Sequence, residues 1–207
     1  MIDLYTWTTP NGRKISIALE EMGIAYTVKP INIRNHEQFA PDFLAISQNN
    51  KIPAIVDTET GTSVFESGAI LVYLAEKSDR FLGAKGSDAR AKALEWLMWQ
   101  VGGFGPMLGQ LNHFAMYRED KIPEAIERFT TEAIRLYKVL DTQLGKSEFV
   151  AGDYSIADMA IYPWSAPALK AVEGLSGQSF ANVERWHKAM EARPAVAKGM
   201  NIPSSNA

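Results

Sequence analysis

The sequence predicts a mixed α/β unit followed by an all-α unit. Within the first 80 residues, short strand-like apolar runs and amphipathic segments follow one another in the order β-α-β-α-β-β-α. From residue 87 onward, apolar residues recur at helical spacing. The turn-rich stretch Gly83-Ala84-Lys85-Gly86-Ser87 stands between the two patterns and is expected to be the linker. We therefore expect two domains, residues 1–80 and residues 87–207.

The first helix has clear start and stop signals. A strand over Ile2 to Tyr5 comes first, and the helix is expected from Pro10 to Met22. Thr9 suits the N-cap, Pro10 suits the first helical position, and Gly23 suits the residue that ends the helix.

The rest of the first unit reads as two strands joined in a hairpin, one further strand and two helices. The expected strands are Tyr26 to Ile31, Ile52 to Asp57 and Ser63 to Phe65, and the expected helices are Pro41 to Ile46 and Ser67 to Lys77. This order of elements matches a thioredoxin-like sheet that is covered by helices.

The second unit is predicted to be a helical bundle. Gly102, Gly103 and the pair Gly105-Pro106 must loosen or kink its first long helix. A regular apolar stripe marks the next helix: Ile122, Ile126, Phe129, Ala133, Leu136, Leu140 and Leu144.

The later part of the helical unit carries a capping box, Ser155-Ile156-Ala157-Asp158, ahead of an apolar run. Its expected role is in folding and not in chemistry. Asn182 to Ala192 is expected to be the final helix, stopped at Arg193-Pro194, and residues 204–207 are expected to be mobile.

Composition narrows the function classes only slightly. The hydrophobic and charged fractions, 46% and 22%, are those of an ordinary globular protein, and the formal net charge of -3 gives no general attraction for nucleic acid or an anionic membrane. No apolar stretch approaches the roughly 20 residues that span a bilayer, and the start lacks the basic and apolar regions of a signal peptide. We therefore expect a cytoplasmic protein without nucleic-acid or membrane partners.

The chain contains no cysteine. Disulfides, thiolate metal sites and a protein thiol nucleophile are therefore excluded, and any redox chemistry at sulfur has to use the substrate's sulfur. The three histidines, His36, His113 and His187, have no metal-ligand spacing, so we expect no metal site.

Two short segments indicate a binding site for an anionic peptide. Pro53 directly precedes a strand; if the Ile52–Pro53 bond is cis, the Ile52 backbone can pair with an extended peptide. Glu66 and Ser67 open a helix, where the Ser67 hydroxyl and nearby N–H groups can hold a carboxylate at the positive end of the helix dipole.

These segments resemble those of the glutathione S-transferase superfamily. The Thr9-Pro10-Asn11-Gly12 start, together with Trp99-Gln100-Val101-Gly102-Gly103 and the segment Gly105 to Gln110, is similar to the bacterial Nu class of disulfide-bond oxidoreductases. The resemblance covers nearly the whole chain. It implies a thioredoxin-like domain followed by a helical bundle, with glutathione as co-substrate, no metal, and a homodimer to which Phe39, Trp96 and Trp99 could contribute contacts.

The resemblance places Asn11, and then Thr9, beside the glutathione sulfur, where donors at a helix start can stabilise a thiolate. In the alternative interpretation Thr9 only caps its helix and Asn11 only solvates the first turn. Tyr5 is a rival thiol donor, because many glutathione transferases use an N-terminal tyrosine. Its place inside a strand favours a core role.

The same resemblance assigns the remaining contacts with glutathione. Ile52 and Pro53 would hold the cysteinyl part, Gln38 and Lys51 the glycyl end, and Glu66 with Ser67 the γ-glutamyl end. Arg128 matches a glutathione-contacting arginine of the helical domain. Arg128 and Lys51 also fit ordinary solvent-exposed charges, and Ser67 also fits a plain helix cap.

The expected reaction is glutathione-dependent disulfide reduction, in which a bound glutathione thiolate attacks a disulfide and a second glutathione resolves the product. One alternative is a general glutathione transferase or peroxidase that acts on small electrophiles or organic peroxides. Another is a non-catalytic, glutathione-transferase-like binding module.

Overall fold

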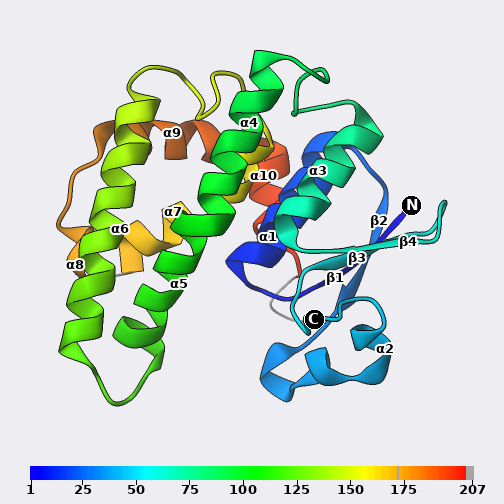
Figure 1. Cartoon of the computed structure of the whole chain (residues 1–207), viewed down its shortest axis with the longest axis horizontal. Coiled ribbons are helices and arrows are strands. Elements are labelled where there is room, and N and C mark those ends of the chain that lie inside the picture. The colour runs from blue at the N-terminus through cyan, green and yellow to red at the C-terminus, as the bar shows by residue number, and fades with distance from the viewer. Residues whose placement is uncertain (172, 204–207) are drawn as a thin grey trace. The chain divides into compact units, whose positions relative to one another are not determined.

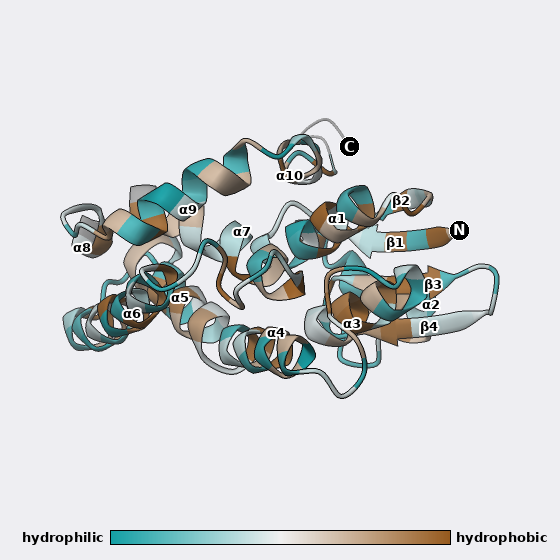
Figure 2. Ribbon diagram, turned by 90° about the horizontal axis from the view of Figure 1, so that it is seen from above, coloured by the Kyte–Doolittle hydropathy of each residue, from teal (hydrophilic) through white to brown (hydrophobic). Residues whose placement is uncertain are grey.

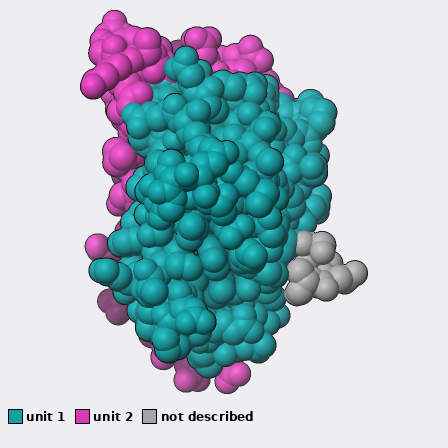
Figure 3. All heavy atoms as spheres, turned by 90° about the vertical axis from the view of Figure 1, so that its right-hand side faces the viewer, with its two compact units in different colours: residues 1–82, 191–207 teal, residues 83–190 magenta. Residues whose placement is uncertain are grey.

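The chain divides into two compact units (Figure 3). The computed structural model describes residues 1–171 and 173–203. Contacts group residues 1–82 with the C-terminal segment that begins at Glu191, and residues 83–190 form the second unit. The break between Leu82 and Gly83 falls at the start of the expected linker, whereas the C-terminal segment joins the first unit. The domain ranges 1–80 and 87–207 remain a prediction from the sequence, and the end expected to be mobile, 204–207, lies outside the described residues.

The first unit contains the predicted four-stranded sheet. The strands β1 (Ile2–Thr6), β2 (Tyr26–Pro30), β3 (Ala54–Asp57) and β4 (Thr62–Phe65) lie in the order β2-β1-β3-β4. β1 pairs with β2 in parallel and with β3 antiparallel, and β3 pairs with β4 as an antiparallel hairpin. β3 begins two residues later than predicted, after Pro53, because a proline has no N–H for the ladder.

The helices of the first unit are α1 (Pro10–Met22), the short α2 (Pro41–Leu44), α3 (Ser67–Ser78) and α10 (Pro194–Gly199). Single 3-10 turns at Ile33–Asn35 and Glu37–Phe39 lie between β2 and α2. α1 and α3 pack side by side (Figure 1).

The bounds of α1 match the prediction because its caps are local. The Gly12 N–H donates to Thr9 Oγ1 at 3.1 Å, and Gly23 ends the helix in the left-handed region at φ 67°. Ile15, Ile17 and Leu19 are fully buried, which indicates that α1 is covered on more than one side.

The C-terminal segment covers α1 and contains a helix, α10, beyond the one that was expected to be the last. α9 (Ala181–Glu191) ends just before Arg193-Pro194, as predicted, but it is not the last helix, because Pro194 begins α10 and a proline fits the first helical position. The Ser16 hydroxyl donates to the Gly199 carbonyl at 2.6 Å, and Arg193 binds the buried Glu21 carboxylate through two bonds, 2.6 and 2.8 Å long. These contacts hold the C-terminal segment against α1.

A buried carboxylate joins β3 to α3. Asp57 accepts a hydrogen bond from the Tyr73 hydroxyl at 2.7 Å and forms an ion pair with Lys77 at 2.9 Å. The hydrogen bond from Lys77 is the main cause that lowers the pKa of Asp57 to about 2, with Tyr73 and the Glu59 N–H acting in the same direction. Asp57 is therefore ionised at neutral pH and ties the sheet to its covering helix.

The second unit begins with an interrupted helix. α4 (Asp88–Trp99) continues through a π-helical turn, Gln100–Phe104, into α5 (Gly105–Asn112) and then a second π-helical turn, His113–Tyr117. The predicted loosening at the glycine-rich segment therefore takes the form of a π turn.

The remaining helices of this unit are α6 (Pro123–Leu144), α7 (Ile156–Ala171), α8 (Glu173–Ser176) and α9 (Ala181–Glu191). Figure 2 shows hydrophobic and hydrophilic residues alternating along α6. The predicted stripe is buried from Ala133 to Leu144, whereas Ile122 at its other end is 38% exposed. Fully buried aromatic side chains, such as Tyr137 and Trp186, form the core of the unit.

The predicted capping box closes the start of α7. The Asp158 carboxylate is fully buried and accepts hydrogen bonds from the N–H groups of Ser155 and Val150 and from the Trp186 indole, each at 3.0 Å. The Ser155 hydroxyl also donates to it at 3.2 Å. Asp158 thus links three separate segments, which agrees with the folding role expected of it.

None of the helices in the described ranges is long and apolar enough to cross a membrane.

Candidate functional site

A small pocket of about 250 Å³ lies in the first unit, where the starts of α1 and α3 meet the turn before β3. Its lining residues are Asn11, Asn49, Lys51, Ile52, Pro53, Phe65, Glu66 and Ser67. Six of these were predicted from the sequence to contact one ligand. The fold therefore brings residues from three distant segments to one place.

The start of α1 reaches the pocket because Gly12 lets the helix approach the end of β1. A Cβ at Gly12 would lie 2.3 Å from Thr6 Oγ1 and 2.5 Å from the Trp7 carbonyl oxygen. Only glycine fits that approach, which sets Asn11 in the pocket wall. Thr9 caps the helix by accepting from the Gly12 N–H, and that bond does not use its hydroxyl proton.

The turn before β3 is held by a buried serine that the sequence analysis did not single out. Ser47 is fully buried, and its hydroxyl donates to the Lys51 carbonyl at 2.9 Å. The Ile52–Pro53 bond that follows is cis, as the peptide-binding hypothesis required. Asn49 reaches across to Glu66, with its Nδ2 3.2 Å from Oε1.

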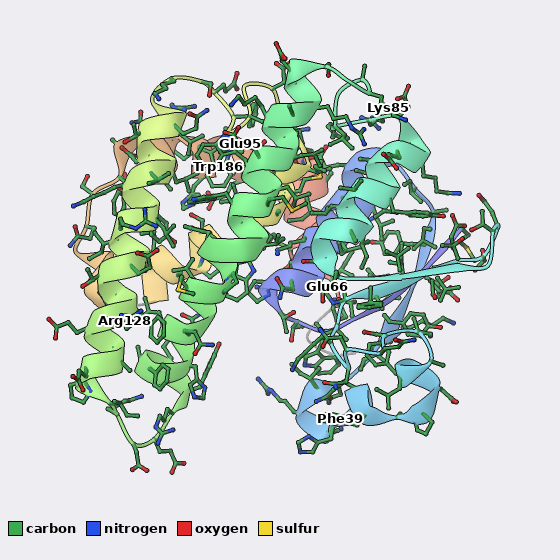
Figure 4. The ribbon with its side chains drawn as sticks, in the orientation of Figure 1. Phe39, Glu66, Lys85, Glu95, Arg128 and Trp186 are labelled. Atoms are coloured by element: carbon green, nitrogen blue, oxygen red, sulfur yellow. The ribbon has the colours of Figure 1, made fainter. Side chains whose placement is uncertain are left out.

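The start of α3 forms the other wall. Glu66 occupies the N-cap with a positive φ of 71°, a conformation that non-glycine residues adopt mainly at constrained sites. Figure 4 shows Glu66 at this junction between β4 and α3. Ser67, the first helical residue, is 8% exposed, and its hydroxyl oxygen lies 3.2 Å from the Lys14 ammonium.

The pocket is suited to an anionic ligand. Two helix N-termini, those of α1 and α3, contribute lining residues, and their N–H groups and dipoles favour negative charge. Lys51 adds a cation, whereas Glu66 adds a carboxylate that suits an ammonium group. A zwitterionic peptide matches this set of charges.

Gln38 and Thr9 are not lining residues of the pocket, although both belong to the same unit. The Gln38 Oε1 atom is buried and has no hydrogen-bond partner in the part of the chain that the structure describes. A buried acceptor without a donor is costly, so an N–H group of a ligand would stabilise it.

The rival thiol donor, Tyr5, has its ring centroid 6.2 Å from that of Phe43 in α2 and is half-buried. Burial, with a smaller effect from Asp3, raises the pKa of its hydroxyl. Tyr5 is not a lining residue of the pocket, which favours the core role over the donor role.

Arg128 lies in the second unit, exposed on α6 (Figure 4). It lines a hollow of about 580 Å³ together with Met107, Glu124, Glu127, Phe129, Thr131 and Glu132. The geometry within this unit fits either a ligand contact or a solvated charge.

Within the described residues, no three side chains of His, Asp or Glu gather as a metal ion would require.

The fold and the pocket together define a class of protein. A thioredoxin-like sheet with a cis-proline turn and a helix-start pocket, followed by a helical unit, is the architecture of the glutathione transferases. The family model of the glutathione S-transferase N-terminal domain matches residues 1–76, and that of the C-terminal domain matches residues 105–194. The chain belongs to the glutathione S-transferase family.

Two curated relatives from Escherichia coli (strain K12) match nearly the whole chain. The disulfide-bond oxidoreductase YfcG is 46% identical over 206 residues, covering 97% of this chain and 94% of the relative. The disulfide-bond oxidoreductase YghU is 42% identical over 219 residues, covering 99% and 76%.

Two solved structures of similar sequence share the fold. A glutathione transferase from Pseudomonas putida, with one glutathione disulfide bound per subunit, superposes with a TM-score of 0.92 at 41% identity, covering 98% of this chain and 91% of that one. A family member from Pseudomonas fluorescens, with two glutathione molecules bound, gives a TM-score of 0.91 at 43% identity, covering 98% and 93%.

Proposed function

We propose that this protein is a glutathione-dependent disulfide-bond reductase that uses the thiolate of bound glutathione. The observation that carries the proposal is the convergence of the α1 start, the cis-proline turn and the α3 start on one pocket, in a chain without cysteine. The names of the two Escherichia coli relatives and the glutathione or glutathione disulfide in the two Pseudomonas structures support the same activity.

The reaction consists of two thiol–disulfide exchanges. The thiolate of the first glutathione attacks one sulfur of the substrate disulfide, forms a mixed disulfide and releases the other sulfur as a thiolate, which takes up a proton. The thiolate of a second glutathione then attacks the glutathione sulfur of the mixed disulfide. Glutathione disulfide forms, and the second substrate sulfur leaves as a thiolate and is protonated.

The protein's part is to align glutathione and to stabilise its thiolate. At pH 7 only about 3% of a thiol with a pKa of about 8.5 is ionised, so donors aimed at the sulfur raise the reactive fraction. Asn11 at the start of α1, supported by the helix dipole and by the Thr9 hydroxyl, is proposed to supply them. No group on the protein has to form a covalent bond.

The other contacts follow from charge and from hydrogen-bonding capacity. Glu66 and Ser67 are proposed to hold the γ-glutamyl ammonium and carboxylate, and the Ile52–Pro53 turn to hold the cysteinyl backbone. Lys51 and the buried side-chain oxygen of Gln38 (Oε1) are proposed to bind the glycyl end of glutathione, which carries a carboxylate and an N–H donor.

Three further proposals carry over from the sequence. Arg128 is proposed to contact glutathione, a cytoplasmic location is proposed as the setting, and the protein is proposed to be a homodimer. Phe39, which is 52% exposed on the first unit (Figure 4), and the half-buried Trp96 and Trp99 are the aromatic residues proposed for the dimer interface. Sedimentation of the purified protein tests the dimer, and Phe39→Ala should shift it toward monomer.

The activity is tested by coupling the reduction of hydroxyethyl disulfide by glutathione to glutathione reductase. Asn11→Ala should lower kcat/KM by about 100-fold, the usual effect of removing one donor to a developing anion. Asn35→Ala, which changes an exposed asparagine of the same unit, is the matched control and should match the wild type.

A parallel assay of conjugation with an aromatic chloride separates the alternatives. Conjugation without disulfide turnover would identify a general transferase. Absence of both activities, together with no binding of glutathione, would overturn the enzyme proposal in favour of a binding module.

A further inference from the structure

The proposed function leaves one buried charge-bearing residue without a role. Lys14 is 2% exposed and ranks among the largest fully buried side chains, a degree of burial that is rare for lysine. It projects from the first turns of α1 toward the start of α3, where its Nζ lies 3.2 Å from Ser67 Oγ. Ser67 lines the pocket, so Lys14 lies directly behind the pocket wall.

The direction of this hydrogen bond is informative. An ammonium group carries three donors and no acceptor, so the Ser67 oxygen accepts and its own proton points elsewhere. Ser67 is the residue proposed to hold the γ-glutamyl carboxylate. A charged Lys14 therefore leaves the Ser67 hydroxyl to donate toward an acceptor in the pocket, and the positive charge behind it favours an anion there.

We propose that Lys14 is a positioning residue of this site: its buried ammonium sets the Ser67 hydroxyl as a donor to the γ-glutamyl carboxylate and balances that charge, so binding is coupled to proton uptake. The inference rests on the proposed function, because it takes glutathione as the ligand. It adds to the proposed site a residue that does not line the pocket, and it predicts that the affinity for glutathione depends on pH.

The surroundings of Lys14 set the pH range. Burial lowers the pKa of Lys14 to about 7, and the charge of Glu66, which faces it from α3, acts in the opposite direction. On the other packed element, the C-terminal segment, Lys198 and Arg193 form ion pairs with Glu20 and Glu21 farther along α1, and Arg13 is the neighbouring charge on α1 itself. Lys14 thus changes charge within the physiological pH range.

A bound carboxylate raises the pKa of this ammonium, and linkage fixes the sign of the effect. Above about pH 7, Lys14 loses its proton in the unliganded protein and has to regain it when the carboxylate binds. Affinity is therefore greatest below pH 7 and falls as pH rises, by at most about tenfold per pH unit.

The experiment is isothermal titration calorimetry with S-methylglutathione, whose blocked sulfur removes the thiol titration. Titrations of the full-length protein at pH 6.5, 7.5 and 8.5, in two buffers with different ionisation enthalpies, give both the affinity and the number of protons taken up. The wild type should take up roughly half a proton or more at pH 7.5. Lys14→Met keeps the length of the side chain and removes the charge, and Lys29→Met, at an exposed position on β2, is the control.

The expected result is a difference in affinity between the wild type and Lys14→Met that becomes smaller as pH rises. Lys14→Met should bind at least about tenfold more weakly than the wild type at pH 6.5, and the two affinities should converge toward pH 8.5, where the unliganded wild type has also lost the charge. A merely structural role for Lys14 would weaken binding equally at every pH. Lys29→Met should reproduce the wild-type profile.

Each remaining outcome decides between the two proposals. Equal proton uptake by the wild type and Lys14→Met would overturn the role of Lys14 and leave the proposed function intact. If Lys14→Met does not fold, the wild type alone decides, because absence of proton uptake at pH 7.5 contradicts the inference and uptake supports it. No binding of S-methylglutathione to the wild type at any pH would overturn both.

Discussion

Replacing Gly12 by alanine tests whether the close approach of α1 to β1 positions the pocket. The added Cβ would lie 2.3 Å from Thr6 Oγ1 and 2.5 Å from the Trp7 carbonyl oxygen. Moving either of these two oxygen atoms away from the added Cβ costs free energy. Thr6 is fully buried and β-branched, and the Trp7 carbonyl is backbone that already accepts the Thr9 N–H at 2.7 Å.

The size of the effect follows from the distances. An ordinary carbon–oxygen contact is about 3.3 Å, so the start of α1 has to move by roughly 0.8 Å away from the Trp7 carbonyl. Such overpacking costs about 1–3 kcal/mol of unfolding free energy, and the better helix propensity of alanine returns at most about 1 kcal/mol. The same movement displaces Asn11, and a misplacement of this size lowers kcat/KM by about 10- to 100-fold.

Urea denaturation and the disulfide reduction assay measure the two effects on one preparation. Gly102→Ala is the matched control, since it places the same methyl group on a helical glycine with nothing within 4 Å. It should be neutral or slightly stabilising and fully active. A Gly12→Ala protein as stable and as active as the wild type would refute the claim that this approach sets the pocket wall.

Three further substitutions test contacts within each of the two units. Asp158→Ala leaves three buried N–H donors without their acceptor and should cost about 4 kcal/mol in urea denaturation; a cost below about 1 kcal/mol would contradict the capping role. Because the pKa of Asp57 is lowered to about 2, its carboxylate contributes stability above its unfolded pKa of about 4, and this stability is lost as pH falls through about 2. Lys77→Met should make the denaturation midpoint less sensitive to pH between about 4 and 2. An unchanged pH profile would exclude the ion pair with Lys77 as the cause of the lowered pKa. Arg193→Ala removes the two hydrogen bonds that Arg193 donates to the buried Glu21 carboxylate and should cost about 3 kcal/mol of unfolding free energy, measured by thermal unfolding. Arg193→Lys should recover only part of this loss, and equal stability of Arg193→Ala and the wild type would count against the contact.

Elements with local signals were predicted closely. α1 has its N-cap, its first-turn proline and its terminal glycine within its own sequence, and its predicted bounds agree with the structure. The glutathione transferase fold was likewise identified from short motifs, and the predicted residues of the cis-proline turn and the α3 start line one pocket. What such motifs cannot give is contact geometry, so the roles of Asn11, Thr9 and Arg128 remain predictions.

Features that depend on distant contacts were missed. The stop at Arg193-Pro194 was predicted correctly, but the helix α10 that follows it was not, because contact with α1 stabilises that short helix. Lys14 was passed over because a lysine beside an apolar helix face is ordinarily solvated. Its burial arises only when α3 covers α1, and a single sequence does not reveal that arrangement.

The return of the C-terminal segment to α1 has a consequence for biosynthesis. A ribosome releases β1, α1 and the rest of residues 1–82 well before it makes Arg193 and α10. Until then Glu21 lacks its arginine and the Ser16 face of α1 lacks its cover, so the first unit emerges first and is completed last. A nascent chain stalled before residue 193 should therefore expose α1 to proteases, and the helical unit has to be synthesised while its predecessor is still open.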